Sequence, residues 1–143
     1  MEEMFRDTNF NQDISSWDVS NVIDMGWMFS IGDFNQPINS WDVSNVTSMY
    51  GMFFNSPFNQ DISEWNVSNV YNMASMFGDT NFNQDISSWD VSNVTDMTSM
   101  FLSSSFNQDL AGWNVSNVSN CGNFALSNSS WTLPKPNFTL CND

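Results

Sequence analysis

The chain has 143 residues, with 16 acidic residues against two basic ones, no histidine and a formal net charge of −14. Phosphate groups are neutralised by Lys and Arg, so this charge argues against nucleic acid and anionic membranes as partners. The missing histidine removes the commonest general base and a favoured zinc ligand. No apolar run of about 18 residues suggests a membrane span, and the start, MEEMFRD, has no secretory signal core.

From Phe10 onward the chain repeats one 24-residue unit, first seen as FNQDISSWDVSNV and restarting at Phe34, Phe58, Phe82 and Phe106. Repeats of constant spacing predict a solenoid, in which each coil hides its apolar side chains against the next. Two columns are predicted as the structural core: Trp17, Trp41, Trp65, Trp89, Trp113 and Asn21, Asn45, Asn69, Asn93, Asn117. The asparagines are expected to form a buried ladder that satisfies backbone groups.

Within one coil, Trp17 and Val19 alternate with Asp18, a pattern that predicts a very short strand with Trp and Val inward. From Val22 the apolar steps lengthen to three, at Met25 and Met28, and predict a single helical or 3-10 turn. The expected fold is therefore a repeat solenoid over residues 1–125, with a short parallel β-strand and a short helix or 3-10 turn in each coil.

The unit FNQDISSWDVSNVTDMTSMF resembles the repeat of BspA-like leucine-rich-repeat surface proteins, in the variant known from mycoplasma surface lipoproteins and from algal and microbial proteins. The resemblance covers roughly Met4 to Asn120. It implies a leucine-rich-repeat-like fold, displayed outside the cell, that serves adhesion or surface architecture and has no catalytic residues. Trp, Val, Met and Phe replace the usual leucines, which leaves the curvature open.

The two ends of the array differ. Met4-Phe5 reads as the tail of a coil whose strand is missing, so either upstream residues are removed or another copy stacks on this end, which would build filaments. At the other end, Pro134 and Pro136 forbid a further regular coil, and residues 126–143 are predicted to form a C-terminal cap. A disulfide between Cys121 and Cys141 would fasten this cap and indicate an oxidising, extracellular setting; two buried free thiols are the alternative.

An outward row follows the tryptophan column and is a candidate ligand-binding surface: Asp18, Asp42, Asn66, Asp90 and Asn114. Such oxygens could bind Ca²⁺ or a hydroxyl-bearing ligand, although we favour a solvated face that discourages edge pairing. A second acidic column, broken by Pro37, is interpreted as turn-forming rather than as an ion site: Asp13, Asp61, Asp85 and Asp109. No metal site and no cofactor is predicted.

Several Asn-x-Ser/Thr sequons occur. If the source is eukaryotic, the expected acceptors are Asn66, Asn114, Asn128 and Asn137, since Asn45, Asn93 and Asn117 belong to the presumed buried ladder. Trp27 lies outside the repeated columns; we expect it to pack on a neighbouring loop, with a partner-binding anchor as the alternative.

Every coil carries similar carboxylates, so no catalytic pair stands out, and there is no nucleophile with a histidine base. We therefore expect no enzyme activity. The first hypothesis is an extracellular or cell-surface repeat scaffold for adhesion or for interaction with a protein or glycan. The alternative is a structural subunit of an extracellular filament, assembled end to end. Ice binding by a flat face is a weaker idea, because Thr is patchy in the column Ile23, Thr47, Tyr71, Thr95, Ser119.

Overall fold

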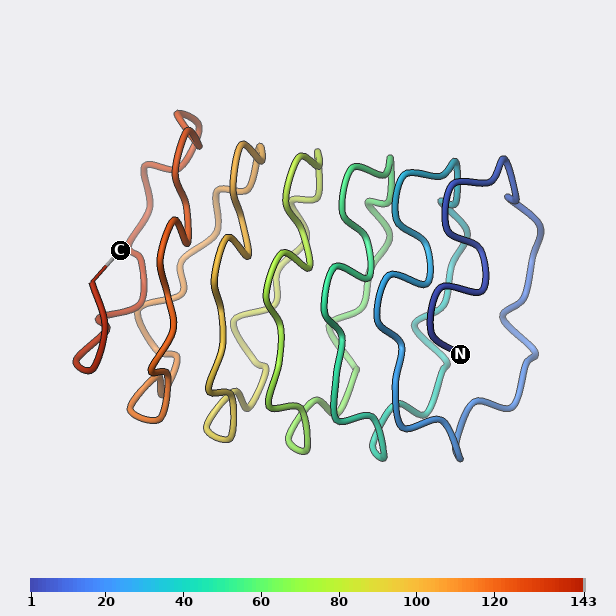
Figure 1. Ribbon diagram of the computed structural model, residues 1–143, viewed down its shortest axis with the longest axis horizontal. Helices are drawn as coiled ribbons and strands as arrows, with labels where there is room; N and C mark the ends of the chain where they lie inside the picture. The colour runs from blue at the N-terminus through green and yellow to red at the C-terminus, as the bar shows by residue number, and fades with distance from the viewer. Residues whose placement is uncertain (143) are drawn as a thin grey trace.

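The computed structural model describes residues 1–142, and these residues contain no helix and no strand. The chain instead winds through successive 24-residue circuits, here called coils, that stack along the long axis with the N-terminus at one end and the C-terminus near the other (Figure 1). Neighbouring coils are linked by four isolated parallel bridges: Asp24–Ser48, Ser48–Asn72, Asn72–Asp96 and Asp96–Asn120. Residue 143, the last of the predicted cap, lies outside the described residues.

The predicted fold class, a leucine-rich-repeat-like solenoid with a strand and a helical turn in each coil, is therefore wrong. No strand forms at Trp17–Val19, because the backbone there bonds within its own coil: Trp17 N–H donates to Ile14 and Val22 N–H donates to Val19. No ladder can form where the backbone groups are used locally in this way.

The predicted helical turn from Val22 to Met28 is also absent, because every second N–H of this segment points to the next coil. Met25 donates to Ser48 at 3.0 Å, Trp27 to Tyr50 at 2.8 Å and Phe29 to Met52 at 3.0 Å. The same set recurs one coil later, where Met49 donates to Asn72 at 2.9 Å. In an α-helix, these N–H groups would instead donate to carbonyls four residues earlier in the same segment.

Left-handed backbone explains how the segment can turn without becoming a helix. Two columns of positions have positive φ, and only one of the twelve is glycine: Glu3, Trp27, Gly51, Ser75, Ser99, Asn123, and Asp7, Ile31, Asn55, Asp79, Ser103, Ser127. Short polar residues such as Asn and Asp tolerate this conformation best. Trp27 at 55° and Ile31 at 56° are the bulky exceptions.

Stacked aromatic columns fill the interior. Phe34, Phe58 and Phe82 are almost fully buried and lie parallel with ring centroids 6.2 Å apart. The repeat period thus places like rings over like rings, an arrangement in which each coil covers the apolar face of its neighbour.

The tryptophan column is buried from Trp41 to Trp113, whereas Trp17, the first in the column, is 40% exposed. The indole Nε1 of each buried member donates to the isoleucine carbonyl of the preceding coil, as Trp41 does to Ile14 at 3.1 Å. The predicted core column therefore gains a polar link as well as apolar burial.

The predicted asparagine ladder forms its bonds, but on the surface. Asn45 Nδ2 donates to the Ser20 carbonyl at 2.8 Å, and Asn69, Asn93 and Asn117 repeat the bond one coil further each time. All five side chains of the column, Asn21 included, are exposed rather than buried. A second ladder, which the sequence analysis missed, runs along Asn11, Asn35, Asn59 and Asn83, whose side-chain oxygens accept the backbone N–H 24 residues later.

The C-terminal segment folds over the last coil. Trp131 packs edge-to-face on Phe106 with centroids 4.8 Å apart, and Phe138 does the same on Phe124 at 4.9 Å. The predicted disulfide is confirmed: Cys121 and Cys141 are bonded, with Cα atoms 5.9 Å apart. The alternative of two free thiols is therefore excluded.

Candidate functional site

The side chains of the outward Asp/Asn row accept hydrogen bonds within their own turns. Asp42 Oδ1 accepts from both the backbone N–H of Ser44 at 3.0 Å and its hydroxyl at 2.6 Å. Asn66 makes the same pair of bonds to Ser68, at 3.2 and 2.8 Å. All members of the row are exposed: Asp18, Asp42, Asn66, Asp90 and Asn114. The row is thus a set of side-chain caps on tight turns.

Hydrogen bonding also sets the electrostatics of this row. The Ser20 and Ser44 side chains, followed by their backbone N–H groups, lower the pKa of Asp18 and Asp42 below its ordinary value. Asp18 opposes this slightly by raising the pKa of Asp42, as expected for like charges in adjacent coils. Asp18 and Asp42 therefore stay ionised at neutral pH and repel each other.

The second acidic column behaves in a similar way. The backbone N–H of Ser15, Ser63 and Ser87 donates to Asp13, Asp61 and Asp85 at 2.9 Å, and Ala111 N–H donates to Asp109 at 3.0 Å. These backbone bonds are the main cause that lowers the pKa of Asp13, Asp61 and Asp85. Within residues 1–142, no three His, Cys, Asp or Glu side chains come close enough together to hold a metal ion.

The candidate glycosylation sites separate by exposure. Asn66, Asn114 and Asn137 are exposed, whereas Asn128 is buried. The Asn128 Nδ2 group donates to Ser104 Oγ at 3.1 Å and to the Phe106 carbonyl at 3.0 Å, so it serves the cap and is not accessible to a transferase. Asn45, Asn93 and Asn117, set aside in the sequence analysis as buried, are on the surface.

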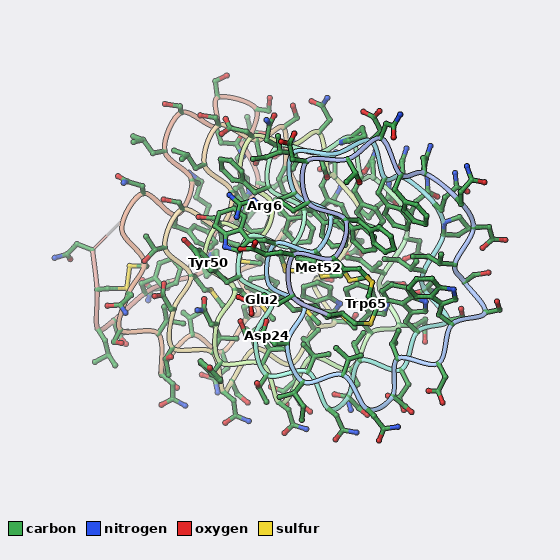
Figure 2. All side chains as sticks on the ribbon, turned by 45° about the vertical axis from the view of Figure 1, so that its right-hand side comes forward. Glu2, Arg6, Asp24, Tyr50, Met52 and Trp65 are labelled. Carbon is green, nitrogen blue, oxygen red and sulfur yellow. A yellow bond between two sulfur atoms is a disulfide. The ribbon has the colours of Figure 1, made fainter. Side chains whose placement is uncertain are left out.

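The regular surface of the first coils is interrupted by a group of three rings and one guanidinium, here called the aromatic cluster. It consists of Arg6, Trp27, Tyr50 and Phe54. Trp27 lies edge-to-face with Tyr50 at a centroid distance of 4.6 Å and with Phe54 at 5.7 Å. The Arg6 guanidinium lies 5.1 Å from the centre of the Trp27 ring. Figure 2 shows Arg6 and Tyr50 on the same side of the molecule as Glu2 and Asp24.

Glycines make room for the large rings of this aromatic cluster. A Cβ at Gly51 would overlap the Trp27 indole, and a Cβ at Gly78 would lie 3.0 Å from Phe54 Cδ2. Trp27 is half-buried by these contacts, as expected from the packing interpretation, whereas Tyr50 remains 39% exposed. The sequence carries a signal for two rings of this aromatic cluster: Trp27 and Phe54 are each followed one coil later by a glycine at the same position, Gly51 and Gly78.

No cavity or cleft opens in residues 1–142, so the candidate surfaces are open faces rather than pockets. Over the same residues, no helix is long and apolar enough to cross a membrane.

The chain matches the family described as "Mycoplasma protein of unknown function, DUF285", over residues 1–79 and again over residues 34–132. Together the two matches cover nearly the whole repeat array, so the chain belongs to this family. No curated protein and no solved structure matches the chain.

Proposed function

We propose that the protein is a non-enzymatic, extracellular repeat scaffold that binds a protein or glycan partner at a cell surface. The observation that carries this proposal is the aromatic cluster. Trp27, Tyr50 and Phe54 stand where later coils carry Ser75, Thr98 and Gly78, so this face departs from the repeat. Partly exposed Trp, Tyr and Arg are the residues most enriched at protein interfaces.

The disulfide supports the extracellular part of the proposal. The Cys121–Cys141 bond closes the cap over the last coil, and such bonds persist in oxidising compartments. Membership of a mycoplasma repeat family and the resemblance to BspA-like surface proteins agree with a place at the cell surface.

The test is binding of the purified chain to a panel of immobilised extracellular-matrix proteins and glycans. We expect saturable binding to at least one member, lost in the double variant Trp27→Ser/Tyr50→Ser and kept in Ile23→Ser, which alters an exposed residue of the same coil outside the aromatic cluster. Binding to no member, or equal loss in both variants, would argue against an interaction scaffold.

A specific observation also favours the alternative function, a filament subunit. The carbonyl groups of Glu2, Met4 and Arg6 accept no hydrogen bond within residues 1–142. At the opposite end, the N–H groups of Asn123, Ala125 and Ser127 donate none within the same residues. The equivalent groups pair between every two neighbouring coils, so the edge of one copy complements the edge of another.

Light scattering and electron microscopy at increasing protein concentration test this alternative. Filament assembly predicts rods that lengthen with concentration, because a head-to-tail contact does not close on itself. Met4→Pro keeps the free Met4 carbonyl and loses an N–H group that bonds within the first coil, to Met1 O at 3.4 Å, so it is not expected to affect such contacts. Ala125→Pro removes a free donor and should shorten the rods. A monomer over the whole concentration range would exclude the filament.

A further inference from the structure

The aromatic cluster already contains one bound cation, supplied by the chain itself. The Arg6 guanidinium lies 5.1 Å from the centre of the Trp27 ring, and its Nη1 donates to Glu3 Oε1 at 3.0 Å. The arrangement combines an aromatic face with a neighbouring carboxylate, and both attract a positive charge.

The next ring offers an aromatic face near carboxylates without a basic side chain over it; the charged group of the chain at this place is the Met1 ammonium, which donates to the Asp24 carbonyl at 2.9 Å. Tyr50 meets Trp27 edge-to-face at 4.6 Å and is 39% exposed. Its backbone lies beside Gly26, around which Glu2 and Asp24 also gather: a Cβ at Gly26 would be 3.5 Å from Tyr50 O, 3.8 Å from Glu2 Cγ and 3.0 Å from Asp24 Oδ1. Figure 2 places Glu2 and Asp24 next to each other and close to Tyr50.

The two carboxylates differ in how far they are engaged. Asp24 Oδ1 accepts the Gly26 N–H at 2.7 Å and is thereby fixed in place. The Glu2 carboxylate makes no hydrogen bond or ion pair with residues 1–142. Glu2 is therefore the group beside Tyr50 that remains available to an incoming positive charge.

The amino-acid composition indicates that a basic side chain for this place comes from a partner. The chain carries only two basic side chains against 16 acidic ones. Arg6 lies on Trp27, and Lys135 lies 5.5 Å from the centre of the Trp131 ring, at the cap. Both are engaged, so Tyr50 and Glu2 have no basic side chain of the described chain to bind, and charge complementarity points to a basic partner.

We propose that an arginine-rich segment of a partner protein docks on the aromatic cluster, with one guanidinium over the Tyr50 ring and paired with the Glu2 carboxylate. It would lie next to Arg6 and repeat the geometry of Arg6, Trp27 and Glu3. This proposal rests on the interaction-scaffold function and names its partner class and contact surface.

The probe is a fluorescently labelled hexa-arginine peptide, titrated with the full chain and followed by anisotropy. We expect Tyr50→Ala and Glu2→Gln each to weaken binding by about fivefold to tenfold, in line with the strength of a cation over an aromatic ring. Tyr50→Phe keeps an aromatic face and should keep most of the affinity. Tyr71→Ala and Glu64→Gln make the same chemical changes at other exposed positions and should bind as the wild-type chain does.

Three outcomes would overturn the docking proposal. One is no binding of the peptide, and another is an equal loss in Glu2→Gln and Glu64→Gln, which would mean unspecific attraction to the acidic surface. The third is binding of a neutral oligosaccharide that needs Tyr50 but not Glu2, which would assign the aromatic cluster to a glycan. If Tyr50→Ala still binds a partner found in the panel, the docking proposal fails while the scaffold function stands; if the wild-type chain binds no panel member, the scaffold function fails.

Discussion

The indole Nε1 of Trp65 donates a hydrogen bond to the carbonyl oxygen of Ile38, 3.1 Å away in the preceding coil. The same carbonyl accepts the backbone N–H of Trp41, at 3.1 Å. One isoleucine oxygen therefore joins the tryptophan of its own coil to the tryptophan of the next. The arrangement repeats at Ile14, Ile62 and Ile86, so the column acts as a polar seam inside an apolar core.

Trp65→Ala is expected to lower the free energy of unfolding by about 3–5 kcal/mol, because it opens a cavity at a fully packed position. Trp65→Phe keeps an aromatic ring and loses one hydrogen bond, worth about 0.5–1.5 kcal/mol, in addition to a smaller packing loss. Urea unfolding followed by circular dichroism measures both. The matched control is Trp17→Ala, because Trp17 is 40% exposed and its truncation should lower the free energy of unfolding by less. Equal losses at Trp17 and Trp65 would contradict the inferred role of burial.

Gly51 and Trp27 are expected to be energetically coupled. Gly51 has a φ of 60° and lies beneath the Trp27 indole, so Gly51→Ala meets both backbone strain and a clash. We expect it to destabilise the chain by about 1–3 kcal/mol, in the range for overpacking. In a Trp27→Ser background the clash is gone, and only the backbone term remains.

A double-mutant cycle separates the two effects. Urea unfolding of Gly51→Ala, Trp27→Ser and the double variant should give a coupling energy of about 1 kcal/mol, as for residues in direct contact. Gly122→Ala serves as control, because a Cβ there meets no atom within 4 Å. Simple additivity of the two substitutions would show that the indole does not constrain Gly51.

The sequence predicted which residues form columns, but not the backbone that carries them. Apolar spacing reports the side chains that face inward, and Phe34, Val43 and Trp65 are indeed buried. The same steps of two and three residues were interpreted as a strand and a helical turn, since those are the commonest backbones with such periods. Spacing alone does not tell them from a chain that has two left-handed residues, four positions apart, in each coil.

A signal for the left-handed residues exists in the repeat. The positions equivalent to Asn55 carry Asp79 and Ser103, short polar residues that tolerate positive φ, and the neighbouring column carries Gly51. The tight-turn caps were similarly visible as Asp-x-Ser spacing, although Asp42 was considered as a ligand group before its bond to Ser44 was known. The aromatic cluster was not predicted, because it depends on contacts between three coils.

Ile31→Asn is expected to stabilise the chain by about 0.5–1 kcal/mol, because a β-branched residue at a φ of 56° is strained and Asn accepts this backbone readily. Ile31 is 41% exposed, so the substitution gives up little burial. Thermal unfolding of Ile23→Asn is the control: Ile23 is 59% exposed and has no positive φ. A loss of stability in Ile31→Asn would mean that side-chain contacts outweigh the strain.

The serine caps predict a pH effect with a definite sign. Hydrogen bonds from Ser44 lower the pKa of Asp42 in the folded chain, so their contribution is complete above the unfolded-state pKa of about 3.9 and is lost as pH falls through the lower folded value. Ser44→Ala removes the side-chain bond, the larger cause, and should raise the Asp42 pKa toward its ordinary value.

Carboxyl NMR titration of Ser44→Ala measures this directly. Asp61, capped separately by Ser63, provides the internal control and should titrate as in the wild-type chain. Asp42→Asn should be nearly neutral at pH 7, since Asn66 makes the same two bonds in the next coil. An unchanged Asp42 titration in Ser44→Ala would show that the hydroxyl does not set the pKa.

The disulfide is expected to hold the cap without shaping the rest of the stack. Cys121 and Cys141 are separated by 20 residues, and closing a loop of this size is worth about 3 kcal/mol in the chain-entropy model. In Cys141→Ser the cap keeps the contact between Trp131 and Phe106 but loses its tether. We therefore expect a lower unfolding midpoint for the cap than for the coils.

Fluorescence distinguishes the cap from the coils, because Trp131 is buried at 7% exposure only while the cap is closed. Trp17→Phe removes the signal of the exposed tryptophan. In the double variant Trp17→Phe/Cys141→Ser, the fluorescence emission should shift to the red at a denaturant concentration that leaves the circular dichroism unchanged. Reducing agent should produce the same early transition in the parent chain and should leave the early transition of Cys141→Ser unchanged. A single transition shared by both probes would mean that the cap and the coils unfold together, and that the bond stabilises the whole chain instead of the cap alone.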